Sequence, residues 1–274
     1  MNNYTKISDI LLKNRIKDFS VTEFDKISPY LLNYKKDLIS GAQNIIMCVF
    51  PYNIGEENMA DDRNITRYAL STDYHVIILN ILKKVCGELK ENYRDNFFMP
   101  FCDSSPIPEV HTAASCGLGA IGKHNLLITE DYGSYIFLGE IITDLDIKGS
   151  PKLNHEIKHC ESCLKCIEAC PSGAITKDKK FDRTKCISFI TQKKGELKDW
   201  EIDLIKNNKL IWGCDICQNM CIHNKNKKLT HIEEFYEDII CRVDNSETEY
   251  KTKRAFLWRG KEIIKRNIDI INKV

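Results

Sequence analysis

Apolar and polar residues follow patterns along the first half of the chain that predict both helices and strands. Ile7, Ile10, Leu11 and Ile16 recur at about helical spacing, so we expect mixed helix over residues 1–40. Residues 44–50 form a short apolar run before Pro51, which predicts a buried strand. Between residues 66 and 93 the apolar positions return once per turn, which predicts one long amphipathic helix.

The segments that follow favour strands. Residues 96–102, 124–129 and 134–143 are short and apolar, and each is predicted to be a strand. Pro106 can open a helix, with Ser104 or Ser105 as its N-cap. Strands mixed with helices in this way predict an N-terminal domain of α/β or α+β architecture.

One glycine motif is misleading. Gly117-x-Gly119-x-x-Gly122 matches the dinucleotide-binding fingerprint, which needs a strand before it and a helix after it. Here a helical stretch precedes the glycines and a strand follows them. The context therefore argues against a Rossmann turn, and leaves open a glycine-rich crossing where the backbone approaches a flat cofactor.

Asp73-Tyr74-His75 is a second near-match. In one cobalamin-binding fold the pattern Asp-x-His-x-x-Gly supplies a histidine to cobalt, but Ile78 occupies the glycine position here. A cobalt-ligating role for His75 is therefore unsupported by this motif. A histidine on a helix surface or in a satisfied core site is the expected alternative.

The net charge of the chain says little about its partners, whereas the local distribution of charge identifies two basic segments. Among 274 residues, 40 basic and 39 acidic side chains give a formal net charge of +1, so no general attraction to nucleic acid or membrane is expected. The apolar runs are too short to span a bilayer, and no export signal is evident, so we expect a cytoplasmic protein without a membrane partner. Residues 251–266 and 223–228 are locally basic; they are candidates for phosphate contact, or simply solvated faces.

Cysteine is the unusual component, with thirteen residues. A reducing compartment disfavours disulfides and favours metal binding. Five cysteines are isolated and are expected to be small buried side chains: Cys48, Cys86, Cys102, Cys116 and Cys241. The other eight lie between residues 160 and 221.

The spacing of these eight predicts iron–sulfur clusters. Cys160-x-x-Cys163-x-x-Cys166-x-x-x-Cys170-Pro171 has the bacterial ferredoxin spacing, in which the fourth cysteine binds the other cluster. We therefore expect two 4Fe-4S clusters. The first would be held by Cys160, Cys163, Cys166 and Cys221, and the second by Cys170, Cys186, Cys214 and Cys217. Zinc sites, which favour two separated pairs of ligands, are the alternative.

Several sequence blocks, in this order, resemble the epoxyqueuosine reductase family. The resemblance covers residue 44 to the C-terminus, with Val110 and Ile222 where family members usually have arginine and proline. The blocks are Asp73-Tyr74-His75, Asp103-Ser104-Ser105-Pro106-Ile107, residues 116–125, residues 132–140, the eight cysteines, residues 213–218 and residues 258–267.

This resemblance implies a cobalamin- and 4Fe-4S-dependent reductase that completes queuosine in tRNA, in a short form lacking most of the C-terminal helical repeats. The implied fold is α+β: residues 1–150 form an α/β cobalamin-binding catalytic domain, 151–230 a ferredoxin-like double-cluster domain, and 231–274 a helical segment. Asp103 would be the proton donor, with a pKa raised by burial beside the corrin. The implied cobalamin contacts are Asp73, His75, Asp103, Gly119, Gly122, Lys123, Asn125, Leu127, Ser134 and Leu138.

The implied partners are tRNA carrying epoxyqueuosine and a one-electron donor such as ferredoxin or flavodoxin. Two alternatives remain at this point. One is the same cobalamin chemistry on an organohalide or a small epoxide. The other is a ferredoxin-type electron carrier without an organic cofactor.

Overall fold

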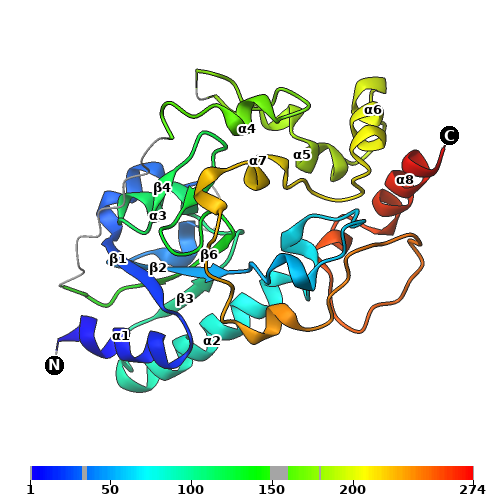
Figure 1. Ribbon diagram of the computed structural model, residues 1–274. Coiled ribbons are helices and arrows are strands. Elements are labelled where there is room, and N and C mark those ends of the chain that lie inside the picture. Colours follow the sequence, from blue (N-terminus) through cyan, green and yellow to red (C-terminus); the bar gives the residue numbers. More distant parts are fainter. Residues whose placement is uncertain (1, 33–35, 149–159, 179, 274) are drawn as a thin grey trace. The chain divides into compact units, whose positions relative to one another are not determined.

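The structure is a computed structural model that describes residues 2–32, 36–148, 160–178 and 180–273 (Figure 1). Contacts along the chain divide it into two compact units. The sheet unit comprises Met1–Tyr52, His75–Ile121 and Leu126–Ile157, and the cysteine unit comprises Asn53–Tyr74, Gly122–Asn125 and Lys158–Val274. Residues 53–74 and 122–125 thus belong with the cysteines, although they lie in the first half of the sequence. The domain boundaries at residues 150 and 230 stay predictions.

The sheet unit is built on four antiparallel strands. In spatial order they are β1 (Asp18–Glu23), β2 (Asn44–Pro51), β6 (Ile136–Thr143) and β3 (Phe98–Phe101). β2 and β6 pair along their whole length, with Asn44 opposite Thr143. Every residue of β2 is buried, which requires cover on both faces and explains why its sequence is uniformly apolar rather than alternating.

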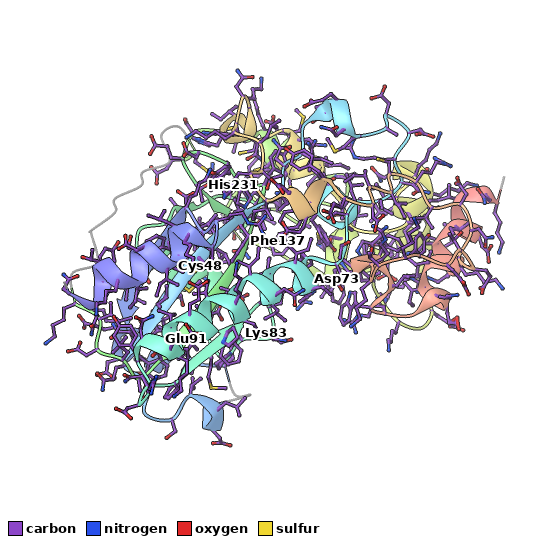
Figure 2. All side chains as sticks on the ribbon, turned by 90° about the horizontal axis from the view of Figure 1, so that it is seen from below. Cys48, Asp73, Lys83, Glu91, Phe137 and His231 are labelled. Atoms are coloured by element: carbon purple, nitrogen blue, oxygen red, sulfur yellow. The ribbon has the colours of Figure 1, made fainter. Side chains whose placement is uncertain are left out.

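One face of the sheet packs against α2 (Tyr74–Asn92), which carries Lys83 and Glu91 along its length (Figure 2). The packing is close at Gly139 in β6. A Cβ atom there would come within 3.0 Å of Leu82 and 3.1 Å of Ile78, both on α2. A glycine is therefore required where the helix crosses the strand.

The other face packs against α3 (Glu109–Ser115). Its Ala113 joins the core cluster with Ile142 of β6, and Phe101 of β3 belongs to the same cluster. After α3 the chain forms the short hairpin β4 (Ala120–Ile121) and β5 (Leu127–Ile128). The glycine motif thus follows a helix, as expected, and strand β4 lies within it between Gly119 and Gly122.

Three expected elements are shorter than predicted or begin elsewhere. The N-terminal helix α1 ends at Lys13 (Asn3–Lys13), and strand β1 follows in a region where we expected helix. α2 begins at Tyr74 rather than at residue 66, because residues 66–73 are drawn into contacts of the cysteine unit. Helix α3 begins at Glu109 with Pro108 as its N-cap, so the predicted start at Pro106 is wrong.

The cysteine unit consists of short helices joined by loops. They are α4 (Lys165–Glu168), α5 (Ile187–Thr191), α6 (Asp199–Asn208), α7 (Ile216–Asn219) and α8 (Lys261–Asn272). Asn267 of α8 is fully buried and donates hydrogen bonds to the carbonyl oxygens of Thr191 and Ile211, at 2.8 and 2.7 Å. This side chain ties the last helix to the segments around α5.

The mixture of helices with an antiparallel sheet confirms the predicted α+β class. Within the described ranges, no helix has the length and apolar character needed to cross a membrane.

Replacing Asn267 with alanine should destabilise the protein by about 2 kcal/mol, since two buried carbonyl groups lose their donor. Urea denaturation measures this as a lower midpoint. Asn207→Ala, at an exposed position on α6, is the matched control and should change stability by less than about 0.5 kcal/mol. Equal midpoints for the two variants would contradict the role given to Asn267.

Candidate functional site

The first predicted group of cysteines comes together in the cysteine unit. Cys166 lies on α4, and its thiol interacts with those of Cys160, Cys163 and Cys221. Burial raises the pKa of the Cys166 thiol, and these three neighbours raise it further. The four thiols are those assigned to one cluster from spacing.

The second group lies near the first, since the Cys217 thiol also interacts with that of Cys166. Cys186 is the N-cap of α5, Cys217 lies on α7, and Cys170 and Cys214 interact with both. Burial, more than the neighbouring thiols, raises the pKa of Cys214 to about 12. Burial also raises the pKa of the Cys186 and Cys217 thiols, whereas at Cys170 burial is outweighed by hydrogen bonds from Ser172 and nearby backbone groups, which lower its pKa. Four half-buried thiols that interact with one another are a donor set that fits a 4Fe-4S cluster.

All thirteen cysteines are free thiols. The five isolated ones are buried or half-buried, as expected for small side chains in a core. Burial raises the pKa of Cys86 to about 12 and that of Cys116 to about 11, so both are neutral thiols.

Lys123 anchors the first cysteine loop. Its buried ammonium group donates to the carbonyl oxygens of Glu161 and Cys163, at 2.6 and 2.9 Å. The positive charge beside this loop favours the net negative charge of a cluster held by four thiolates. Lys123 was predicted as a cobalamin contact, and in the structure it holds the first cysteine loop.

Asp215, between Cys214 and Cys217, anchors the segment 53–74. Its buried carboxylate accepts hydrogen bonds from the Thr66 hydroxyl and, at 2.7 Å, from the Arg67 backbone N–H. The Arg67 guanidinium is also buried and contacts Glu56 at 2.6 Å. This network went unnoticed in the sequence, where the arginine and the aspartate are 148 residues apart.

In the sheet unit, two predicted site residues meet. Asp103 follows β3 in a left-handed conformation with φ of 60°, and its carboxylate lies 3.1 Å from Nε2 of His75, at the start of α2. The exposed fractions of the two side chains are 53% and 37%, so the pair is open to a ligand. An accessible carboxyl group paired with an imidazole can deliver a proton to a bound substrate.

Two further carboxyl groups lie beside this pair. Glu109 Oε1 accepts a hydrogen bond from the Asp103 backbone N–H at 2.9 Å, and Glu140 of β6 is completely buried next to Glu109. Burial, then the charges of Glu140 and Asp103, raises the pKa of Glu109 to about 10. Burial likewise raises the pKa of Glu140 to about 7. The signal available in the sequence was a glutamate in the middle of an apolar strand.

The other predicted cobalamin contacts are divided between the units. With Asp103 and His75, the sheet unit holds Gly119, Leu127, Ser134 and Leu138. The cysteine unit holds Asp73, Gly122, Lys123 and Asn125.

Two of these residues also have clear structural roles. Leu127 is a core residue, and a Cβ atom at Gly119 would lie 2.4 Å from the Ile128 carbonyl oxygen. The close approach expected at Gly119 is therefore to the backbone of β5. As cobalamin contacts, all of these residues remain predictions.

Comparison with known proteins identifies the family. Residues 34–104 match the family model described as "Epoxyqueuosine reductase QueG, DUF1730", and residues 159–224 match a "4Fe-4S double cluster binding domain". An epoxyqueuosine reductase of Cyclobacterium marinum is 35% identical over 227 residues, covering 81% of this chain and 70% of the relative. One of Cellulophaga algicola is 31% identical, covering 95% and 86%. The chain belongs to the epoxyqueuosine reductase family.

This result confirms the predicted resemblance and places the chain in a family of oxidoreductases. The chain covers different shares of the relatives. It spans 44% of the Escherichia coli epoxyqueuosine reductase, to which it is 36% identical over 172 residues, and 48% of that of Aliivibrio fischeri.

Solved structures share the fold. The epoxyqueuosine reductase of Streptococcus thermophilus superposes with a TM-score of 0.82 at 25% identity, covering 99% of this chain and 81% of that one. A reductive dehalogenase has a TM-score of 0.58 at 14% identity, covering 98% of this chain and 35% of its own. The dehalogenase likeness concerns the fold alone.

Cys163→Ser should lower the iron content of reconstituted protein from about eight toward about four atoms per chain, since one 4Fe-4S cluster loses a ligand. Iron analysis and cluster absorbance measure the loss. Cys86→Ser, at an isolated thiol of the sheet unit, should keep the full content. Unchanged iron in Cys163→Ser would refute the assignment of that ligand.

Proposed function

We propose that this protein is a cobalamin-dependent 4Fe-4S reductase that converts epoxyqueuosine in tRNA to queuosine, with Asp103 as the proton donor. The observation that carries the proposal is the accessible Asp103–His75 pair in a chain whose other unit gathers eight thiols in two groups of four. The relatives named epoxyqueuosine reductase support the reaction. A structure of one such enzyme with an epoxyqueuosine-modified tRNA stem loop supports the substrate.

The chemistry suits these residues. Reducing an epoxide to an alkene takes two electrons and two protons and releases the oxygen as water. Cobalamin, when bound, would supply a strongly nucleophilic cobalt centre. Asp103 protonates the oxygen as the ring opens, and His75 orients the Asp103 carboxyl group.

The two thiol groups suggest the electron path. A segment with predicted cobalamin contacts, Gly122–Asn125, is bonded through Lys123 to the loop of the first group. The second group has one member, Cys186, in the wall of an open cavity of about 370 Å³. Electrons would enter at the second cluster and pass through the first toward cobalt.

The same cavity suggests the electron donor. Its wall includes Arg183, Lys194 and Arg259, and among the described residues that line it none is acidic. Trp258 is 59% exposed, with the Arg259 guanidinium stacked 3.7 Å from its ring centre. A basic rim with an exposed aromatic side chain fits an acidic one-electron carrier protein such as ferredoxin or flavodoxin.

Asp103→Asn should keep both clusters and cobalamin but lose queuosine formation by about a hundredfold or more, because the amide cannot give up a proton. Nucleoside mass analysis after incubation with epoxyqueuosine tRNA measures the product, and Asp95→Asn, at an exposed position, is the control. Wild-type rates in Asp103→Asn would remove it from the mechanism. Turnover of an organohalide or small epoxide without any tRNA binding would instead favour the alternative substrates.

Reversing the charges of Arg183 and Lys194 to glutamate should slow cluster reduction by flavodoxin about tenfold and weaken its salt dependence. Reduction by dithionite, which needs no docking surface, should be unchanged. Stopped-flow bleaching of cluster absorbance measures both reactions. The double reversal Lys83→Glu and Lys84→Glu, at exposed positions on α2 of the sheet unit, is the charge-matched control. Equal slowing with both donors would place the effect on the cluster itself.

A further inference from the structure

Glu140 occupies an apolar row of β6. Side chains alternate along a strand, so residues 138, 140 and 142 share one face. Leu138 and Ile142 join the core cluster beneath α3, and Glu140 between them is 0% exposed. The Glu140 carboxyl group is thus buried among the apolar side chains of the core.

Little supports a negative charge on Glu140, because burial raises its pKa by more than hydrogen bonding from the side chains of Ser105 and Glu109 lowers it. Within the described part of the chain, neither of its carboxylate oxygens receives a hydrogen bond of standard geometry, although Ser105 and Glu109 lie close enough to affect its pKa. An unsupported buried carboxylate costs far more than a neutral acid. Glu140 is therefore stable in the core when it carries or shares a proton.

Glu109 connects this buried group to the site. Its carboxyl group lies beside that of Glu140, and its Oε1 accepts the N–H of Asp103. Two carboxyl groups at such close range cannot both ionise, because the second charge would be repelled by the first. A proton shared between them satisfies both.

We propose that Glu109 and Glu140 form a proton-sharing carboxyl pair that resupplies Asp103 during turnover. The proposal rests on the proposed function, in which Asp103 is the donor. Both glutamates are positioning and proton-supply residues, and neither contacts the substrate.

The reaction consumes two protons, whereas Asp103 carries one at a time, so a second proton source is needed. Two electrons from the one-electron carrier and two protons convert the epoxide to an alkene and water. Before turnover Asp103 carries one proton and the neutral pair carries two. Asp103 delivers the first proton, and one O–H bond of the pair then breaks to reprotonate the Asp103 carboxylate, which delivers the second. The pair is left with a single shared proton and one negative charge. His75, which is partly exposed and contacts the Asp103 carboxyl group, provides the route by which solvent restores both protons.

The titratable neighbours of the pair do not take part in sharing its proton. Asp103 acts on both glutamates, and its charge raises both pKa values. Cys48 of β2 is the other titratable neighbour of Glu140, and burial raises its pKa so far that it stays a neutral thiol. Among the described residues, Asp103 is the charged group outside the pair that acts on it.

The raised pKa values have a consequence for stability. Both glutamates have folded-state pKa values, about 7 and about 10, above the ordinary value of 4.5. Their contribution is thus fully present below pH 4.5 and is lost as pH rises through these values. Glutamine at position 140 mimics the protonated acid and removes this loss. Glu140→Gln should therefore become more stable relative to wild type as pH rises from 6 to 9.

The test compares Glu140→Gln and Glu109→Gln with Glu91→Gln, an exposed glutamate of α2 (Figure 2). Glutamine 109 would keep the acceptor for the Asp103 N–H, so a merely structural role would survive that change. In the cluster-loaded protein, infrared spectra should show a protonated carboxyl band in wild type at pH 7 that shifts in frequency in Glu140→Gln, because the proton on Glu109 is then no longer shared with a second carboxyl group. Queuosine formation should fall about tenfold or more in both pair variants and remain normal in Glu91→Gln.

Each readout decides a separate question. Parallel melting temperatures from pH 6 to 9, together with an unchanged carboxyl band, would overturn the shared proton. A shift of the band with normal queuosine formation in both pair variants would overturn the resupply of Asp103. If the wild-type protein formed no queuosine, the proposed function and the resupply would both fail, while the band and the melting temperatures would still decide the shared proton.

Discussion

The gathering of eight thiols into two groups of four is the constraint on which the cysteine unit depends. The thiols come from three separate parts of the chain, and burial raises the pKa of Cys214 to about 12. Without metal, such a cluster of small thiol side chains contributes little stability to the core. With metal, each group becomes a fixed point around which short helices are arranged. Lys123 and Asp215 extend the arrangement, because each ties a distant segment to a cysteine loop.

The sheet unit depends on apolar packing instead, and this packing sets the protonation of Glu140 by burying its carboxyl group. β2 is buried throughout and β6 is buried from Gly139 to Thr143, so a side chain on either face of these segments is removed from water. Glu140 is placed there by strand alternation, and its environment then determines its protonation. Asp103, held by Glu109 at the end of β3, stays accessible. The largely buried Glu109–Glu140 pair, proposed as the proton source, therefore differs in exposure from the neighbouring donor Asp103.

Parts of the fold were predictable wherever local pattern and tertiary environment agree. The uniformly apolar run at residues 44–50 is strand β2, because a fully covered strand needs no polar face. The helix expected from residue 66 begins instead at Tyr74, since Arg67 and Thr66 are bonded to Asp215. Strand β1 was missed because pairing with β2, rather than its own composition, makes it a strand.

The amino-acid sequence by itself determined the chemistry available to this protein. Cysteine spacing predicted two clusters, and the block around Asp103 identified a candidate acid, because ligand number and short-range order are encoded locally. Only the tertiary structure decided which groups meet. It brought His75 to Asp103 and enclosed Glu140 beside Glu109, across sequence separations that no local pattern encodes. Burial and proximity set pKa values, and both are properties of the folded chain.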